Sequence, residues 1–452
     1  MAERARRLAL SHLACLGRHT VTGLLCAAGR QFQDWSADYR LLERERVDEE
    51  ALFTALQREL ENSLAPDQPL VAAMDDSILR KRGRRVSGVG WRKDPLGPAF
   101  HVNFALGQRV LQISAALPLN EHKARMVPID FQHAPPAVKP RSNASDEEWQ
   151  QYREAAGQAQ INVRGVERLR RLRERTPAGR PLWVLVDGRF TNRTVLRNLP
   201  PDTVLIGRIR KDAKLHERPG ASPGGRGRRR VYGDRLPTPD DLRRDESVPW
   251  QAVPVFACGE HFQFHVKTLA PARWSGAGAR DLRLVVIRPL GYRKTRLGKL
   301  LYRRPGFLIC TDPELPIEKI LQAYVWRWDI EVNFRDEKTL LGVGQAQVRT
   351  PVAVQKAPAM GVAAYSLLLL AAARAFGAAG RPDQLPPPKW RAPRCDRRAS
   401  TAELINQLRF EMWGEAIAPD NFSGFSPPAS PPTQKPPKIP GALESAIFYA
   451  MN

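Results

Sequence analysis

The sequence predicts an α/β protein: a mixed sheet with flanking helices, a β-rich insertion, and a separate helical region at the N-terminus. Two unbroken apolar runs, at residues 69–77 and 180–188, have the composition of buried central strands, and acidic residues end each run. Helical patterns precede and follow these runs, and several shorter strand-like runs lie before residue 312. The 452 residues are too many for one ordinary domain.

The composition indicates a polyanionic partner. The chain has 71 Lys and Arg against 47 Asp and Glu, a net charge of +24. This excess favours nucleic acid first and an anionic membrane second. The five cysteines form no Cys-x2-Cys pair, which suits a reducing cytosol. We therefore expect a cytoplasmic, nucleoid-associated protein.

Two apolar segments are candidates for membrane or export signals, and neither is expected to act as one. Ser11 and His12 interrupt the apolar stretch at the N-terminus, which argues against a signal peptide. The run 357–373 is borderline for a membrane span, but it contains Pro358 and Ser366. We predict that it is a buried core helix and that the protein has no membrane part.

The first 66 residues are predicted to be helical. Asp48 is placed to cap a helix that begins with two glutamates, and leucines recur at four-residue spacing after it. The segment 34–40 breaks the pattern and is predicted to be a turn between helices.

The first central strand is predicted to span 69–77 and to end in acids that a metal could reach at the edge of the sheet. Side chains alternate along a strand, so Asp75 and Ser77 share one face and Asp76 lies on the other. Asp75 is the preferred candidate, with Asp76 as the alternative. The arginine-rich segment 80–85 follows at once and is predicted to form a rim that binds the DNA backbone.

The second central strand, 180–188, is the clearest in the sequence. Asp187 ends it, and Gly188 lets the backbone turn sharply. Of the other segments, 219–230 is rich in Gly, Pro and Arg and is predicted to be a flexible loop. The remaining predicted strands are 99–106, 110–117, 204–208, 255–258, 261–266, 282–287 and 306–310, and the remaining predicted helices are 146–175, 191–199 and 401–413.

The stretch 316–342 is predicted to be a helix with a charged stripe. Tyr324, Arg327, Glu331 and Lys338 fall within an arc of roughly 60° on such a helix. The flanking residues are apolar, so the helix is expected to pack against the protein. A carboxylate beside two cations suits a metal ligand next to phosphate-binding groups. A plain salt bridge between Arg327 and Glu331 is the structural alternative.

This stripe, Y-x2-R-x3-E-x6-K, resembles the YREK signature of DDE transposases from bacterial cut-and-paste insertion sequences. The resemblance implies a ribonuclease-H-like core in which Glu331 is the third catalytic acid after Asp75 and Asp187. It also implies that Tyr324, Arg327 and Lys338 hold the DNA phosphates beside the scissile bond. The context of Asp187, Val-Asp-Gly-x-Phe, is similar to that of the family's second acid.

Three clustered carboxylates need a cation. At an effective dielectric near 20, two of them ~4 Å apart repel by about 4 kcal/mol. Asp75, Asp187 and Glu331 are therefore predicted to hold two Mg²⁺ ions, for which Mn²⁺ could substitute, so that water or a 3′-hydroxyl attacks a phosphodiester. The sequence has no GxxxxGK[ST] loop, so no nucleotide cofactor is expected.

The predicted function is metal-dependent cleavage and strand transfer at insertion-sequence ends, that is, cut-and-paste transposition. The expected partners are double-stranded DNA, as terminal inverted repeats and as target, and a second copy of the chain in a homodimer. The alternatives are a structure-selective DNA nuclease of the same fold and a domesticated, non-catalytic DNA-binding protein.

Five regions are predicted from these assignments. They are an N-terminal helical DNA-binding region (1–66), the first part of the core (67–211), the β-rich insertion (212–312), the second part of the core (313–378), and a Pro/Arg-rich C-terminal region with a short helix and a disordered tail (379–452).

Overall fold

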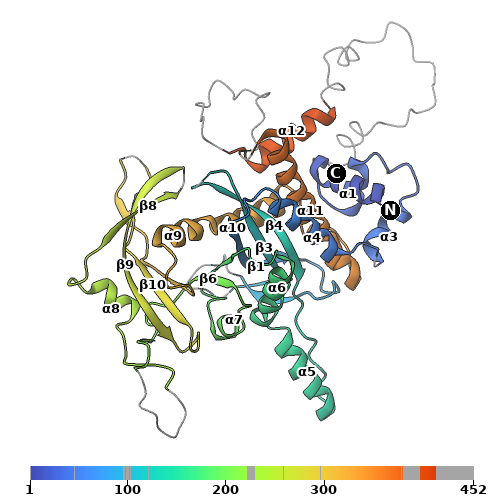
Figure 1. Cartoon of the computed structure of the whole chain (residues 1–452). Coiled ribbons are helices and arrows are strands. Elements are labelled where there is room, and N and C mark those ends of the chain that lie inside the picture. The colour runs from blue at the N-terminus through green and yellow to red at the C-terminus, as the bar shows by residue number, and fades with distance from the viewer. Residues whose placement is uncertain are drawn as a thin grey trace, which may run out of the picture.

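A large mixed sheet with helices on both faces organises the chain (Figure 1). The computed structural model describes all residues except 1, 45, 95–96, 98–100, 102, 121, 221–229, 258, 296, 378, 380–397 and 414–452. The predicted loop 219–230 and the predicted C-terminal tail lie mostly or wholly outside the described residues. The mixed sheet with flanking helices confirms the predicted α/β class.

Five strands form the centre of the sheet in the order β4-β3-β1-β5-β6. β1, β5 and β6 run parallel, whereas β3 is antiparallel to both of its neighbours in this order. The short β2 pairs with the first residues of β3. The bounds are β1 Leu70–Arg80, β2 Gly90–Lys93, β3 Phe104–Pro118, β4 Ala124–His133, β5 Leu182–Val186 and β6 Thr203–Arg208.

The strands of the predicted β-rich region extend this same sheet beyond β6. β13 pairs antiparallel with β6 and leads to β10, β9 and then β8 and β7. All four strands predicted between 255 and 310 are present, and the division into domains stays a prediction. The bounds are β7 Leu215–His216, α8 Pro239–Arg244, β8 Gln251–Ala257, β9 Glu260–Trp274, β10 Asp281–Ile287 and β13 Gly306–Cys310, with a separate ribbon of β11 Gly291–Arg293 and β12 Leu300–Tyr302.

The N-terminal and C-terminal helices pack together on one side of the molecule (Figure 1). α11 is long and apolar enough to cross a membrane by length and composition, but 67% of its most apolar window is buried inside the protein. It contacts β4 as well as three of the N-terminal helices, as a core helix does. The bounds are α1 Ala2–Ala14, α2 Val21–Ala27, α3 Ser36–Glu43, α4 Glu49–Glu61, α11 Pro351–Phe376 and α12 Thr401–Trp413.

The two faces of the sheet have separate apolar cores. One core joins the sheet to α4, α6 and α11, and the other joins it to α9 and α10. The bounds of the remaining helices are α5 Asp146–Gln158, α6 Ile161–Arg175, α7 Arg193–Arg197, α9 Ile317–Trp326 and α10 Trp328–Thr339.

The strand predicted at 110–117 is confirmed as part of the longer strand β3, which begins at Phe104 and so includes the end of the strand predicted at 99–106. Residues 99, 100 and 102 of that prediction lie outside the described residues. Gly107 lies within β3, where the neighbouring strand leaves no room for a side chain. A Cβ atom on Gly107 would lie 2.7 Å from the carbonyl oxygen of Leu79 on β1. The true partner of the hairpin is β4, which the sequence reading did not identify.

Two helix predictions and one turn prediction also need correction. The single helix at 146–175 is two helices, α5 and α6, because Gln160 adopts an extended backbone between them. The turn predicted at 34–40 is wrong from Ser36 onward, where α3 begins. The helix predicted over 316–342 is interrupted at Arg327, whose amide bonds to the carbonyl of Val325, so α9 ends and α10 begins there.

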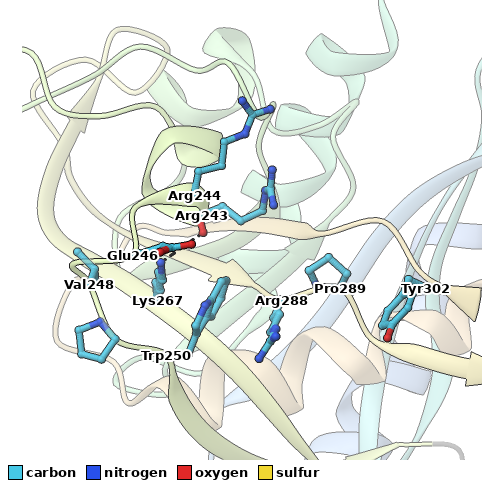
Figure 2. Close-up of a pocket in the computed structure, with 10 residues that line it drawn as sticks. Arg243, Arg244, Glu246, Val248, Trp250, Lys267, Arg288, Pro289 and Tyr302 are labelled. Carbon is cyan, nitrogen blue, oxygen red and sulfur yellow. Dashed lines mark hydrogen bonds between the residues drawn. The ribbon is translucent and has the colours of Figure 1, made fainter.

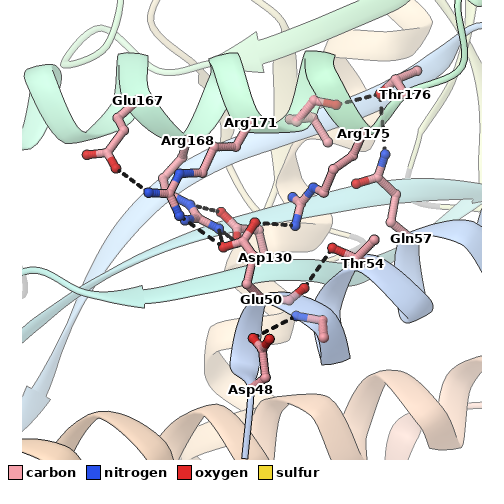
Figure 3. A network of polar contacts seen from close by, with 12 residues as sticks. Asp48, Glu50, Thr54, Gln57, Asp130, Glu167, Arg168, Arg171, Arg175 and Thr176 are labelled. Carbon is pink, nitrogen blue, oxygen red and sulfur yellow. Dashed lines mark hydrogen bonds and ion pairs between the residues drawn. The ribbon is translucent and has the colours of Figure 1, made fainter.

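A buried ion pair ties the N-terminal helices to the core (Figure 3). The Nε atom of Arg168 on α6 donates to Asp130 on β4 at 2.7 Å, and a second bond joins its Nη2 to the same carboxylate. Nη2 also reaches Glu50 on α4 at 3.0 Å, which Arg171 and Arg175 contact as well. The side chains of Arg168 and Asp130 are 4% and 1% exposed. If one of the two were removed, water could not reach the other to solvate its charge.

We expect Asp130→Ala to destabilise the protein by about 3 kcal/mol, because it leaves the buried guanidinium of Arg168 with only the more exposed Glu50 as its counter-charge. Chemical denaturation measures the loss. The control is Glu167→Ala, which breaks an exposed pair with Arg171 on the same helix and should change stability by less than about 1 kcal/mol. Equal effects of the two substitutions would show that the buried pair does not anchor the N-terminal helices.

Candidate active site

The two acids of β1 point to opposite faces of the sheet. Val71 and Ala73 belong to the core under α9 and α10, whereas the even-numbered residues 70 to 74 belong to the opposite core. Asp75 continues the first series, so its side chain faces α9 and α10. Asp76 lies on the other side, where its carboxylate binds Arg109 at 2.7 Å and Arg189 at 3.5 Å. Asp75 therefore has the position that the sequence analysis preferred.

β1 does not end at these acids, as the sequence suggested, but continues to Arg80. It continues because its antiparallel pairing with β3 extends to Arg80. Its parallel pairing with β5 stops earlier, at Met74 opposite Val186. The acids thus lie just beyond the point where β1 and β5 part.

Asp187 follows the last residue of β5 and lies at the level of Asp75. One of its carboxylate oxygens accepts the backbone amides of Arg189 and Phe190, at 2.8 and 3.3 Å. These bonds close the turn after β5 and fix the carboxyl group at the carboxyl end of the sheet.

Arg327, at the junction of α9 and α10, links the carboxylate of Asp75 on β1 to that of Glu331 on α10. Its Nη1 atom lies 3.4 Å from Asp75, and its Nη2 atom donates to Glu331 at 2.9 Å. The guanidinium is largely buried, with 10% of the side chain exposed. Burial alone would lower the pKa of Arg327, but Tyr324, Asp75 and Glu331 raise it above its usual value. The predicted Arg327–Glu331 salt bridge is present, as part of this larger contact.

The other two residues of the stripe, Lys338 and Tyr324, contact β1 and Arg327 respectively. Lys338 on α10 donates to the hydroxyl of Ser77 at 2.6 Å, on the same face of β1 as Asp75. The guanidinium carbon of Arg327 lies 5.6 Å from the centre of the Tyr324 ring. The hydroxyl of Tyr324 is buried and has no hydrogen-bond partner among the described residues. All four side chains of the stripe therefore lie toward the sheet despite the helix break.

The electrostatics of the site show a shortage of positive charge at the aspartates. Burial and the neighbouring Asp187 raise the pKa of Asp75 to about 7, although Arg327 acts in the opposite direction. Burial also raises the pKa of Asp187. Burial raises the pKa of Tyr324 to about 12, so its phenol stays neutral.

The predicted metal fits this charge shortage. In the described part of the chain, no three Asp, Glu, His or Cys side chains lie close enough together to ligate an ion as they stand. Asp75 nevertheless shares its one cationic partner, Arg327, with Glu331, and Asp187 forms no ion pair among the described residues. Carboxylate oxygens are also the ligands that Mg²⁺ prefers. Asp75 and Asp187 would hold an ion directly, and Glu331 would join them by exchanging its bond to Arg327. The role of the three acids stays a prediction.

A basic cavity of about 770 Å³ begins at Asp187 and Gly188, and the sequence analysis did not find it. Arg208, the last residue of β6, lies at the same edge of the sheet as Asp187. A cation at the end of a strand that is parallel to the acid-bearing strands is the signal that could have identified it. The side chains that line the cavity include Arg193, Arg197, Arg208, Arg210, Tyr232 and Trp274.

The predicted basic rim at 80–85 is only partly available to a ligand. Lys81 is half-buried and its Nζ atom donates to the carbonyl of Gly344 at 2.5 Å. Arg80 is exposed but pairs with Asp94 at 2.6 Å. Arg82, Arg84 and Arg85 are exposed.

A comparison with known protein families matches residues 2–255 to the DDE superfamily endonucleases. This match covers more than half of the chain and includes Asp75 and Asp187, and it ends before α9 and α10. No curated protein matches the chain. The sheet order and the flanking helices agree with the ribonuclease-H-like fold of DDE nucleases, which act on DNA and generally use divalent metals. On the extent of this match and this fold, the chain belongs to the DDE superfamily endonucleases.

Proposed function

We propose that this DDE endonuclease is a cut-and-paste transposase of the YREK type, which cleaves the ends of an insertion sequence and joins them to target DNA. One observation carries the proposal. The whole Tyr324–Lys338 stripe faces the strand that bears Asp75, with Arg327 in contact with Asp75 and Lys338 in contact with Ser77. A salt-bridged outer face of a helix would not place these groups against the ends of the central strands.

The acidic residues of the site bind metal ions, and the basic residues bind phosphate. Bound Mg²⁺, or Mn²⁺ in its place, supplies Lewis acidity and an activated oxygen nucleophile. Asp75, Asp187 and Glu331 hold the two ions at the end of the sheet. Arg327 and Lys338 then release their protein partners and bind phosphate oxygens, for which guanidinium and ammonium groups are suited. Tyr324, whose ring lies next to the guanidinium of Arg327, completes this phosphate-binding set.

The basic cavity beside Asp187 supports DNA as the substrate of this site. Its four arginines lie next to one of the candidate metal ligands, and two aromatic side chains line it as well. Together with the net charge of +24, this arrangement suits a polyanion held across the acids. The terminal inverted repeats, the target DNA, a homodimer on the DNA and a location at the nucleoid all belong to this proposal.

The direct test is cleavage in Mg²⁺ of a plasmid that carries the gene with its native flanking DNA. The proposal expects double-strand breaks at short inverted repeats in the flanks and none in a plasmid without the flanks. Cutting of a synthetic four-way junction with no cutting at the flanks would favour the structure-selective nuclease instead. Binding to the flanks without any cutting would favour the non-catalytic DNA-binding protein.

We expect Glu331→Ala to slow cleavage at least about a hundredfold while DNA binding persists or tightens slightly. The substitution removes a metal ligand that stabilises the transition state by several kcal/mol, and it removes a negative charge that faces the DNA. Glu331→Gln should behave in the same way, because it keeps a hydrogen-bond acceptor for Arg327 but not the charge. Gel assays of binding and cleavage, with a thermal melt of each variant, measure these effects.

Lys338→Ala should instead weaken DNA binding, and higher protein concentration or lower salt should partly restore cleavage. The control is Lys319→Ala, which removes an exposed ammonium of α9 and should leave both properties unchanged. If the Glu331 and Lys338 variants lose binding, cleavage and melting temperature in parallel, the stripe is structural and the proposal is wrong.

Asp75→Asn should stabilise the metal-free protein more at pH 8 than at pH 5. Burial beside Asp187 raises the pKa of Asp75 to about 7 from its usual 3.8. The folded protein therefore binds more protons than the unfolded chain between these values, and stability falls as the pH rises through this window. Asparagine removes this loss, so the melting temperature of the variant relative to the natural protein should rise with pH.

Added Mg²⁺ should raise the melting temperature of the natural protein at pH 8 but not that of Asp75→Asn. The control is Asp76→Asn, which loses the ion pair with Arg109 and should melt lower while keeping its response to Mg²⁺. If Asp76→Asn loses the response and Asp75→Asn keeps it, Asp76 is the metal ligand.

A further inference from the structure

A second cavity, of about 840 Å³, is lined by residues of α8, β9 and β12 and of the segments just before β8 and just after β10 (Figure 2). Four cationic side chains line it: Arg243, Arg244, Lys267 and Arg288. Glu246 is the acid among the lining residues, so the cavity has a clear positive excess. The candidate active site does not use any of these groups.

A buried lysine builds one wall of this cavity. Lys267 on β9 is 2% exposed, and its Nζ atom donates to the backbone carbonyls of Leu242, Arg243 and Asp245 at the end of α8. The same Nζ atom lies 4.6 Å from the centre of the Trp250 ring. Lys267 therefore holds the end of α8 and Trp250 in fixed positions.

The arginines of the cavity differ in how strongly they are engaged. Arg243 and Arg244 both pair with Asp240, at 2.7 and 2.8 Å. Arg288 is exposed, and within the described residues it forms no ion pair with a carboxylate. Its guanidinium lies 6.0 Å from the centre of the Trp250 ring, a contact that holds the side chain but leaves its donors free for a ligand.

The register of the sheet places Arg288, which lines this cavity, at the same edge as the candidate acids, with the cavity on the sheet face of α8 and the acids on the face of α9 and α10. Val186 of β5 is level with Gly207 of β6, which is level with Ile309 of β13, which in turn is level with Leu284 of β10. β13 is antiparallel both to β6 and to β10, so β10 runs in the same direction as β6 and therefore as β5. Arg288, which follows β10, thus leaves the sheet at the same edge as Asp187.

Strand spacing gives the separation along this edge. Three strand spacings lie between β5 and β10, which is roughly 14 Å, and Arg288 extends roughly 10 Å beyond the level of Asp187. Arg208, at the end of β6, leaves the sheet at the same edge between them. A straight DNA duplex with a rise of about 3.4 Å per base pair would cover this distance in about five base pairs.

We propose that the cavity of Arg243, Arg244, Trp250 and Arg288 binds the phosphate backbone of duplex DNA about five base pairs from the bond that is cut. The proposal rests on the proposed function for the position of the cut, and on the charge and register of this cavity for the contact itself. Arg288 makes the main contact, because its guanidinium is exposed and has no carboxylate to give up.

The test compares Arg288→Ala with Arg280→Ala in the full-length protein. Arg280 comes just before β10, so the control removes the same charge at the opposite edge of the sheet. Binding to a fluorescently labelled 30-base-pair duplex of arbitrary sequence is measured between 50 and 200 mM KCl. The slope of log K against log salt should fall in magnitude by about 0.9 for Arg288→Ala and stay unchanged for Arg280→Ala. Arg288→Lys should restore the slope.

A footprint on the cleaved flank DNA locates the contact. Protection of the backbone about five base pairs from the cut should be lost in Arg288→Ala and kept in Arg280→Ala. Equal slopes and footprints for the two alanine variants would overturn this inference alone, provided that the natural protein binds and cuts. An effect on a 30-nucleotide single strand without one on the duplex would also overturn it. A natural protein that neither binds nor cuts DNA would instead defeat the proposed function.

Discussion

The guanidinium of Arg327 lies between a carboxylate of the central strand and a carboxylate of α10, in a place where water has little access. Buried acids repel one another, and at an effective dielectric near 20 two of them ~4 Å apart are disfavoured by about 4 kcal/mol. Burial and the neighbouring Asp187 raise the pKa of Asp75 to about 7, because the single cation Arg327 does not offset both effects. The helix junction, the position of the stripe and the affinity of the site for further positive charge all depend on this balance.

The parts of the fold that depend on local pattern could be predicted from the sequence. Unbroken apolar runs identified β1 and β5, and alternation along a strand placed Asp75 and Asp76 on opposite faces. Helical spacing placed Tyr324, Arg327, Glu331 and Lys338 on one side, and the structure turns that side toward β1.

The parts that depend on distant neighbours could not be predicted. Gly107 lies inside β3 against Leu79 of β1, and nothing in the local sequence shows this contact. Lys81 belongs to a basic run, but its burial is set by a carbonyl more than 250 residues away. The sequence around Arg208 is that of an ordinary strand end. Arg208 lies near Asp187 only because β6 is the neighbour of β5 in the sheet.

The packing of the N-terminal helices on α11 has a consequence for the synthesis of the protein. More than three hundred residues separate α1 from α11, which covers it. At 5–20 residues per second, the ribosome needs roughly 15 to 60 seconds to make this interval. During that time the apolar surface of α1, α3 and α4 that α11 covers in the finished protein lacks this partner, so the nascent chain is open to chaperones and to aggregation. Premature stops before residue 351 would leave that surface permanently uncovered, and proteases would be expected to remove such products.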